Sequence, residues 1–253
     1  PEVLALREQE SSPNGMGWRV RVVPNRYPAL ASTDHHCDTA DGLYQSRSGI
    51  GVHEVIIECP HAESNFARLS LQNIREVLGV YRDRLLELKQ DRRLVHALIF
   101  KNQGTLAGAS LPHSHSQLIA STFVPSVIEQ ELSGARQYFE EHGRNLFFVM
   151  IDEEIKDGSR VVFETELFVA FCPYASRFPF EICIIPKYSS SHYENLTQPA
   201  ISELGSVLRT VLVKFDRELD QPSYNFVLHS APFDQPELPY FQWHLELFPR
   251  LTR

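Results

Sequence analysis

The chain contains little cysteine, almost no methionine and no long apolar run. Its 253 residues include 4 cysteines and 2 methionines, and polar residues interrupt the longest apolar stretches within a few positions. A membrane-spanning helix needs about 20 consecutive apolar residues, so we expect no membrane segment. Because there is neither a Cys-x-x-Cys pair nor a signal-peptide pattern, we expect reduced thiols and a cytoplasmic protein.

Positive charge is also scarce. The chain has 24 Lys and Arg against 32 Asp and Glu, which gives a formal net charge of -8. Nucleic-acid binders neutralise a phosphate backbone with clustered cations, so this balance argues against a nucleic-acid partner. A small anionic ligand needs only a local cluster of donors, and we therefore expect a small-molecule partner. With 43% hydrophobic residues, the chain is long enough for a well-buried core, in one large domain or two small ones.

The strongest organisational signal is an internal repeat. Each copy has a β-rich run, an amphipathic helix, a strand and a run containing histidine. In the first copy these elements lie at about 54–58, 70–89, 94–100 and 113–117, and in the second at about 181–186, 200–219, 225–229 and 241–246. The stretch from Glu54 to His115 is nearly as long as that from Glu181 to His244. A repeat of this kind indicates a duplicated architecture.

The patterns within each copy predict the fold class. The apolar residues of the helix at 70–89 keep a three-four spacing, which gives one buried stripe. The strand candidates are short and rich in Val, Ile and Phe. We therefore predict an α+β fold made of two halves, each with an antiparallel sheet and helices packed on it. We expect a first half at 1–128, a bridging segment at 129–158 and a second, degenerate half at 159–253.

One run in the first half combines the groups that a phosphoryl-transfer site needs. Small residues at 104–110 let backbone N–H groups approach phosphate oxygens. His115 is the candidate nucleophile, since neutral imidazole attacks phosphorus at pH 7 without a separate strong base. In a strand, His113, His115 and Gln117 would line one wall. The alternatives are a surface loop rich in His and Ser, or a structural metal site that uses both histidines.

The run His-Ser-His-Ser-Gln at 113–117 resembles the His-x-His-x-Gln signature of the galactose-1-phosphate uridylyltransferase branch of the histidine-triad superfamily. Its flanking runs at 100–104, 107–110, 176–181 and 243–246 are most similar to the ADP-glucose phosphorylase-like members. The resemblance covers nearly the whole chain. It implies histidine-triad-like halves, a covalent nucleotidyl intermediate on His115 and a homodimer.

The resemblance also implies roles for the neighbouring residues. Gln117 would hydrogen-bond the transferred phosphoryl group. His113 is assigned to the catalytic run, where it would orient His115 through the loop backbone. Asn25 and Arg26 match the nucleoside-binding pair of the family, although the uridylyltransferases have an acidic residue where Arg26 stands. The candidate substrate-binding residues are Asn25, Arg26, Asn102, Gln103, Gly104, Ser110 and Gln117.

The implied function is ping-pong nucleotidyl transfer between a nucleoside diphosphate sugar and a sugar 1-phosphate, of the galactose-1-phosphate uridylyltransferase type. Two alternatives stay open. One is an adenylyltransferase of the ADP-glucose phosphorylase type, which would use inorganic phosphate as the acceptor. The other is a catalytically weakened nucleotide-binding paralogue. Hydrolysis of nucleotide conjugates is disfavoured, because histidine-triad hydrolases usually carry a third His where Gln117 stands.

Zinc is the one cofactor that the resemblance implies, and no organic cofactor is expected. At a first candidate site His113 would be a ligand with His61 nearby, and the cysteine pair of the family would lie before Pro1. A second candidate site stands where the uridylyltransferases have one Glu and three His. Its residues are Glu131, His229, His244 and Glu246.

The second candidate site also has a simpler interpretation, which the sequence alone favours. Glu131 would then be a solvated helix residue, and His229 and His244 would be core positions of the degenerate half. Similarly, Arg177 and Glu181 are interpreted as an ion pair at the sheet edge rather than as substrate contacts.

Overall fold

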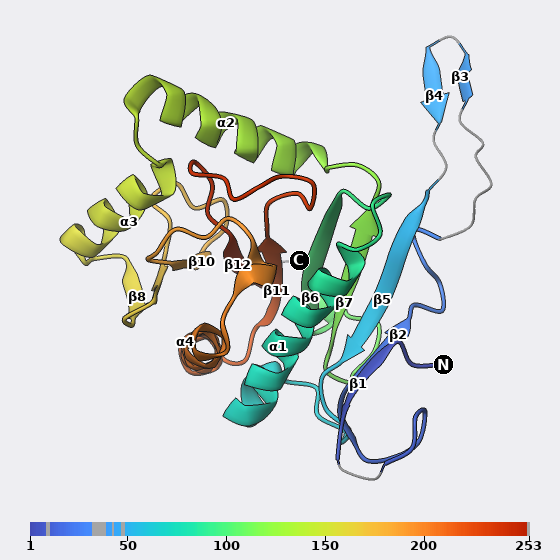
Figure 1. The fold of residues 1–253 in the computed structure, drawn as a ribbon. Coiled ribbons are helices and arrows are strands. Elements are labelled where there is room, and N and C mark those ends of the chain that lie inside the picture. The colour runs from blue at the N-terminus through green and yellow to red at the C-terminus, as the bar shows by residue number, and fades with distance from the viewer. Residues whose placement is uncertain (9–10, 32–38, 42, 47–48, 252–253) are drawn as a thin grey trace.

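A computed structural model describes residues 1–8, 11–31, 39–41, 43–46 and 49–251 of the protein. Ten strands in these ranges form one antiparallel sheet (Figure 1). In spatial order they are β1 (Leu4–Arg7), β2 (Trp18–Pro24), β5 (Gly51–Ile57), β7 (His115–Ser121), β6 (His96–Gln103), β11 (Ser223–His229), β12 (His244–Arg250), β10 (Ile182–Pro186), β9 (Phe168–Phe171) and β8 (Val161–Glu164). A hairpin of β3 (Thr39–Asp41) and β4 (Tyr44–Ser46) projects from the body (Figure 1).

The two halves repeat one order of elements. The first runs β5, α1 (Leu71–Leu88), β6 and β7, and the second runs β10, α4 (Gln198–Glu218), β11 and β12. The central strands β6 and β11 pair with each other, with Asn102 opposite Asn225, so both halves contribute to one sheet. The predicted α+β fold with duplicated halves is confirmed. The boundaries proposed at 128 and 158 stay predictions.

Helices α1 and α4 lie side by side on one face of the sheet (Figure 1). Ser70 caps α1, because its hydroxyl accepts a hydrogen bond from the backbone N–H of Asn73. Thr197 caps α4 in the same way, and a proline follows in the first turn. The buried stripe of α1 includes Ile74, Leu78 and Leu85, as the three-four spacing predicts. This face therefore holds the main core of the molecule.

The predicted bridging segment folds into two helices, α2 (Ser126–His142) and α3 (Leu146–Asp157). They pack against the opposite face of the second half. Phe147 of α3 packs in one cluster with Val169 of β9, whereas the adjacent Phe168 faces the core beneath α4. Neighbouring residues of a strand point to opposite faces, so β9 is apolar on both.

Two expectations about the whole chain can be compared with the described residues. Within these ranges, no helix is both long enough and apolar enough to traverse a bilayer. Cys59, Cys172 and Cys183 are free thiols, as predicted, while Cys37 lies outside the described residues.

Candidate active site

Strand β7 places His115 and Gln117 on the face of the sheet opposite α1. Ser116, between them, points the other way, and its hydroxyl meets the phenol of Tyr81 in α1. The predicted alternation of side chains therefore holds for His115 and Gln117. It does not hold for His113, because β7 begins at His115 and the preceding residues form a loop. The prediction that all three residues line one face of a strand is therefore wrong for His113.

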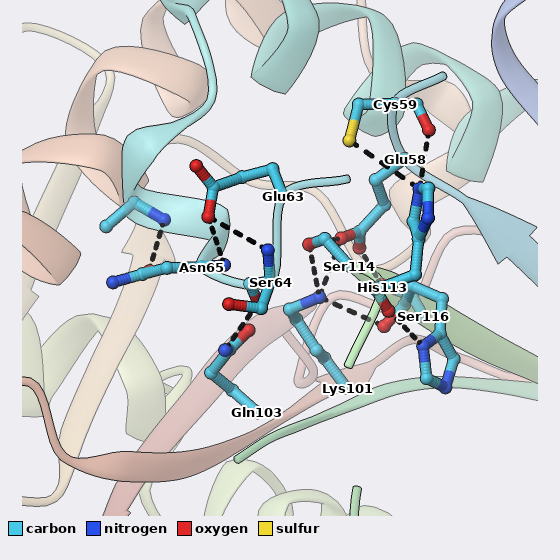
Figure 2. Close-up of polar contacts among 12 residues, drawn as sticks. Glu58, Cys59, Glu63, Ser64, Asn65, Lys101, Gln103, His113, Ser114 and Ser116 are labelled. Carbon is cyan, nitrogen blue, oxygen red and sulfur yellow. Dashed lines mark hydrogen bonds and ion pairs between the residues drawn. The ribbon is translucent and has the colours of Figure 1, made fainter. Parts of the chain in front are cut away.

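The imidazole of His115 has a defined tautomer. Its Nδ1 lies 2.7 Å from the backbone oxygen of His113. A carbonyl oxygen only accepts, so Nδ1 donates to it, and in the neutral ring Nε2 keeps the lone pair. The His113 ring is itself anchored, with Nε2 2.7 Å from the backbone oxygen of Cys59 and 3.8 Å from its Sγ (Figure 2). His113 thus holds the loop that orients His115.

A hollow of about 320 Å³ lies beside His115. It is formed by the end of β6, the loop after it and the start of β7. Its lining includes six of the predicted site residues, namely Asn102, Gln103, Gly104, Ser110, His113 and His115. The side-chain nitrogen of Gln103 donates to the backbone oxygen of Ser64, which also lines the hollow (Figure 2). The run identified in the sequence therefore forms one concave surface.

Glycine conformation shapes the wall of this hollow. Gly104 has a φ of +79°, and a Cβ at this position would lie 2.3 Å from the Ser223 hydroxyl oxygen. Gly108 has a φ of +86°. Side chains are disfavoured in this backbone region, so the two glycines permit a tight turn, in which the N–H groups of residues 107–109 donate to the backbone oxygens of Gly104 and Thr105.

Gln117 and Asn25 meet on the β5 side of His115. The Oε1 atom of Gln117 lies 2.9 Å from Nε2 of His53 and 3.5 Å from Nδ2 of Asn25. His53 is not among the site residues predicted from the sequence. The one feature that could have indicated it is its position in β5. His53 lies on the same face of this strand as Val55, which pairs with Gln117.

A second contact that the sequence analysis missed involves Asn225 of β11. Its Nδ2 donates to Oδ1 of Asn102 at 2.7 Å and to the backbone oxygen of Ala107 at 2.9 Å. Its own oxygen accepts from Nε of Arg250 at 2.7 Å. Asn225 is buried, so these contacts fix it firmly. The second half thus supports a residue of the hollow in the first half.

A buried ion pair underlies the catalytic run. Nζ of Lys101 lies 2.6 Å from Glu58, and it also donates to the Ser114 hydroxyl at 3.1 Å and to the backbone oxygen of His115 at 3.0 Å (Figure 2). The hydroxyls of Ser114 and Ser116 donate to the same carboxylate. Burial lowers the pKa of Lys101, and the negative charge of Glu58 opposes that shift. This network ties the backbone of β7 to the end of β5.

Two of the predicted site residues have other surroundings. Arg26 is exposed, and its guanidinium lies 5.6 Å from the centre of the Tyr27 ring. His61 is exposed too. Among the described residues, one group of three His, Cys, Asp or Glu side chains lies close enough to hold a metal ion, and it includes neither His61 nor His113. The first candidate zinc site is therefore incomplete in these ranges.

The group that does cluster is Glu131, His229 and His244, whose potential ligand atoms all lie within 4.8 Å of one another. Nδ1 of His229 is 2.9 Å from Oε2 of Glu131, and Nε2 of His244 is 3.2 Å from Oε1. The interpretation of Glu131 as a solvated helix residue is wrong, because α2 directs this carboxylate onto both imidazoles. The two histidines are buried, as that interpretation predicted.

Glu246 extends this cluster towards the sheet edge. Its Oε2 lies 3.3 Å from Nε2 of His229 and also pairs with Arg177. Arg177 pairs with Glu181 at 2.7 Å, so the predicted edge ion pair is present. Burial would raise the pKa of Glu246, but His229, His244 and Arg177 lower it to about 2. A carboxylate engaged with Arg177 is less available to a metal than Glu131 is.

The pKa values of the two imidazoles in the cluster are shifted in opposite directions. Burial would lower the pKa of His229, but its hydrogen bonds to Glu131 and Glu246 raise it to about 9. Burial lowers the pKa of His244. Nδ1 of His244 lies 3.1 Å from the backbone oxygen of Gln242, so its Nε2 directs a lone pair at the Glu131 carboxylate. A cation between Glu131 and His244 would stabilise these facing lone pairs and would displace the proton from Nδ1 of His229, so the three residues fit a metal ion.

Family models match both halves of the chain. The N-terminal domain of galactose-1-phosphate uridyl transferase matches residues 9–125, and the C-terminal domain of the same family matches residues 131–253. The chain belongs to the galactose-1-phosphate uridyl transferase family. It is an enzyme that transfers nucleotidyl groups, as the sequence analysis predicted.

Individual relatives come from two branches of this family. The chain is 35% identical to an ADP-glucose phosphorylase of Arabidopsis thaliana, over 97% of this chain and 72% of the relative. It is 30% identical to a galactose-1-phosphate uridylyltransferase of Thermotoga maritima, over 89% of this chain and 71% of the relative. Among solved structures, the Arabidopsis ADP-glucose phosphorylase with bound ADP-glucose has a TM-score of 0.85 at 33% identity, covering 100% of this chain and 78% of that one.

Proposed function

We propose that the protein transfers a nucleoside monophosphate between phosphorylated partners through a covalent bond to Nε2 of His115. The observation that carries this proposal is the hydrogen bond from Nδ1 of His115 to the backbone oxygen of His113. In the neutral ring it leaves the lone pair on Nε2, at a hollow whose lining includes the Asn102 amide and the Ser110 hydroxyl. A nucleophile needs such a free lone pair, and a phosphate needs such donors.

The proposed reaction has two balanced steps. In the first, Nε2 of His115 attacks the α-phosphorus of a nucleoside diphosphate sugar. An N–P bond forms, the P–O bond to the β-phosphate breaks, and the sugar 1-phosphate leaves. In the second, an oxygen of an acceptor phosphate attacks the same phosphorus and the N–P bond breaks. The His113 carbonyl stabilises the positive charge that the ring carries between these steps.

Two donor and acceptor pairs fit this reaction. A uridylyltransferase would use UDP-glucose and galactose 1-phosphate, whereas an ADP-glucose phosphorylase would use ADP-glucose and inorganic phosphate. The similarity to the Arabidopsis phosphorylase, whose solved structure contains ADP-glucose, supports the second pair. The uridylyltransferase relatives support the first.

Mass spectrometry of the intact protein tests the proposal and separates the pairs. The protein is incubated with UDP-glucose or with ADP-glucose, and the adduct is mapped by peptide analysis. We expect a uridylyl or an adenylyl group on His115, which galactose 1-phosphate or inorganic phosphate then removes. Nucleotide binding without an adduct would instead support a catalytically weakened paralogue and contradict the proposal.

We also propose that Glu131, His229 and His244 bind zinc. Their spacing and the lone pair of His244 aimed at Glu131 support this assignment. A bound zinc ion would link α2 to β11 and β12 and so have a structural role, since these residues are distinct from those around His115.

A homodimer is the remaining proposal, and it comes from the family resemblance. Size-exclusion chromatography with light scattering tests it, with an expected mass of twice the 29.0 kDa of one chain. A monomer across the micromolar range would contradict it.

A further inference from the structure

We propose that His53 and Asn225 are positioning residues, which hold the amides of Gln117 and Asn102 so that both NH₂ groups face the substrate phosphates. The proposal rests on the transfer function proposed above. An amide presents a donor at one end and an acceptor at the other, and its orientation decides which end a phosphate meets. Ionised phosphate oxygens only accept hydrogen bonds, so an amide that turned its oxygen towards them would repel them.

The orientation of Gln117 follows from the tautomer of His53. The backbone N–H of Ala29 donates to Nδ1 of His53 at 3.0 Å. In the neutral ring Nε2 must then carry the proton, which it donates to Oε1 of Gln117 at 2.9 Å. Nδ2 of Asn25 lies 3.0 Å from the same Nε2 and 3.5 Å from Oε1 of Gln117, so two donors converge on that oxygen. If the amide were reversed, its NH₂ group would face the N–H group of His53. The Gln117 oxygen is therefore held on the β5 side, and its NH₂ group is left for a ligand.

The orientation of Asn102 follows from that of Asn225. Nε of Arg250 only donates, so the atom of Asn225 that it contacts at 2.7 Å is the oxygen. The carbonyl of Ala107 only accepts, so the atom 2.9 Å from it is the Asn225 nitrogen. That nitrogen also contacts Asn102 at 2.7 Å, which must therefore turn its oxygen towards Asn225. The NH₂ group of Asn102 is left at the glycine loop of the hollow, where a Cβ on Gly108 would meet it at 3.9 Å.

In both amides the protein therefore holds the oxygen and leaves the NH₂ group for a ligand, although the two residues that hold them belong to different halves of the chain. His53 belongs to β5 of the first half, whereas Asn225 belongs to β11 of the second. The second half, which lacks the catalytic signature, therefore contributes to the phosphate site through Asn225.

Four single variants test this proposal. His53→Phe removes the N–H donor, whereas His53→Gln offers an amide N–H at a similar distance from the backbone. Asn225→Asp keeps the size of the side chain and the acceptor for Arg250 but cannot donate. Asn102 should therefore turn its NH₂ group towards position 225 and its oxygen towards the hollow. Asn145→Asp is the matched control. Asn145 is also buried, but it caps α3 and donates to the backbone oxygen of Pro239.

Two readouts are measured on each variant: the affinity for inorganic pyrophosphate by calorimetry, and the rate of nucleotide addition to His115 by mass spectrometry. We expect His53→Phe and Asn225→Asp to weaken pyrophosphate binding and to slow addition by about tenfold or more, the usual effect of losing a hydrogen bond to a charged group. His53→Gln should restore both readouts to within about threefold of the starting protein, and Asn145→Asp should leave them unchanged.

A double variant separates positioning from general stability. In a Gln117→Ala background, His53→Phe should have no further effect on pyrophosphate affinity, because the amide that it orients is absent. Pyrophosphate carries no nucleoside, so this readout is independent of Asn25, whose Nδ2 also lies 3.0 Å from Nε2 of His53. A full additional loss would overturn the proposal. So would unchanged readouts in His53→Phe and Asn225→Asp, or a starting protein that does not bind pyrophosphate. If pyrophosphate binding follows the expected pattern but no adduct forms, positioning stands and the transfer function fails.

Discussion

The Nδ1–H group of His115 donates to the backbone oxygen of His113, two residues earlier in the chain and 2.7 Å away. The contact involves the main chain of His113, so substitution of the His113 side chain leaves the acceptor in place. The proposed nucleophile His115 therefore acts through its side chain, whereas His113 orients it through its main chain.

The first prediction concerns this difference. His115→Ala should reduce the exchange of labelled sugar 1-phosphate into the nucleotide sugar by about a thousandfold or more, because no covalent intermediate can form. His113→Ala should cost less, since the carbonyl remains. His142→Ala on the exposed end of α2 is the control. Normal exchange in His115→Ala would contradict the assigned nucleophile.

The second prediction concerns the ion pair of Lys101 and Glu58. Lys101→Met should lower the free energy of unfolding by about 3 to 5 kcal/mol, because a buried carboxylate is left without its partner. Adding Glu58→Gln should recover part of that loss. Urea denaturation measures both. The more exposed pair of Lys187 and Glu164 is the control, and Lys187→Met should cost about 1 kcal/mol or less. Equal costs in the two pairs would contradict this account of the buried network.

The third prediction concerns metal content. Protein purified without a His tag or a chelator should contain one zinc per chain by elemental analysis. Glu131→Gln and His244→Ala should lose it, because each removes one ligand of the cluster. Glu129→Gln, an exposed change in the first turn of α2, should retain it. The assignment fails if the starting protein remains metal-free after incubation with zinc.

The fourth prediction concerns acid stability. Burial lowers the pKa of His96 from 6.5 to about 4, and Nε2 of this ring has no hydrogen-bond partner among the described residues. The folded protein binds this proton less readily than the unfolded chain does. The stability contributed by neutral His96 is therefore complete above pH 6.5 and is lost as the pH falls towards 4.

From pH 7.5 to pH 5 this loss is roughly 2 kcal/mol. His96→Leu should reduce the pH dependence of the unfolding free energy by that amount, as measured by urea denaturation at the two pH values. An unchanged pH dependence would show that His96 is not the group responsible.

Much of the candidate site was predictable because it depends on neighbours in the sequence. The alternation of strand residues places His115 and Gln117 on one face, and the glycines at 104 and 108 indicate a loop suited to phosphate. The helical stripe of α1 and the repeated order of elements predict the duplicated α+β fold. Each of these features needs only local periodicity or a run of a few residues.

The tertiary structure decided which distant side chains complete that site. His53 meets Gln117, Asn225 meets Asn102, and Glu131 reaches His229 and His244, and every one of these pairs joins elements far apart in the chain. The register of the strands and the docking of the helices bring these residues together. Local periodicity does not predict either, and a register shift of one residue would turn each strand side chain to the other face of the sheet. The sequence by itself therefore determined the candidate nucleophile and its loop, whereas the fold determined which distant residues contact Gln117 and Asn102.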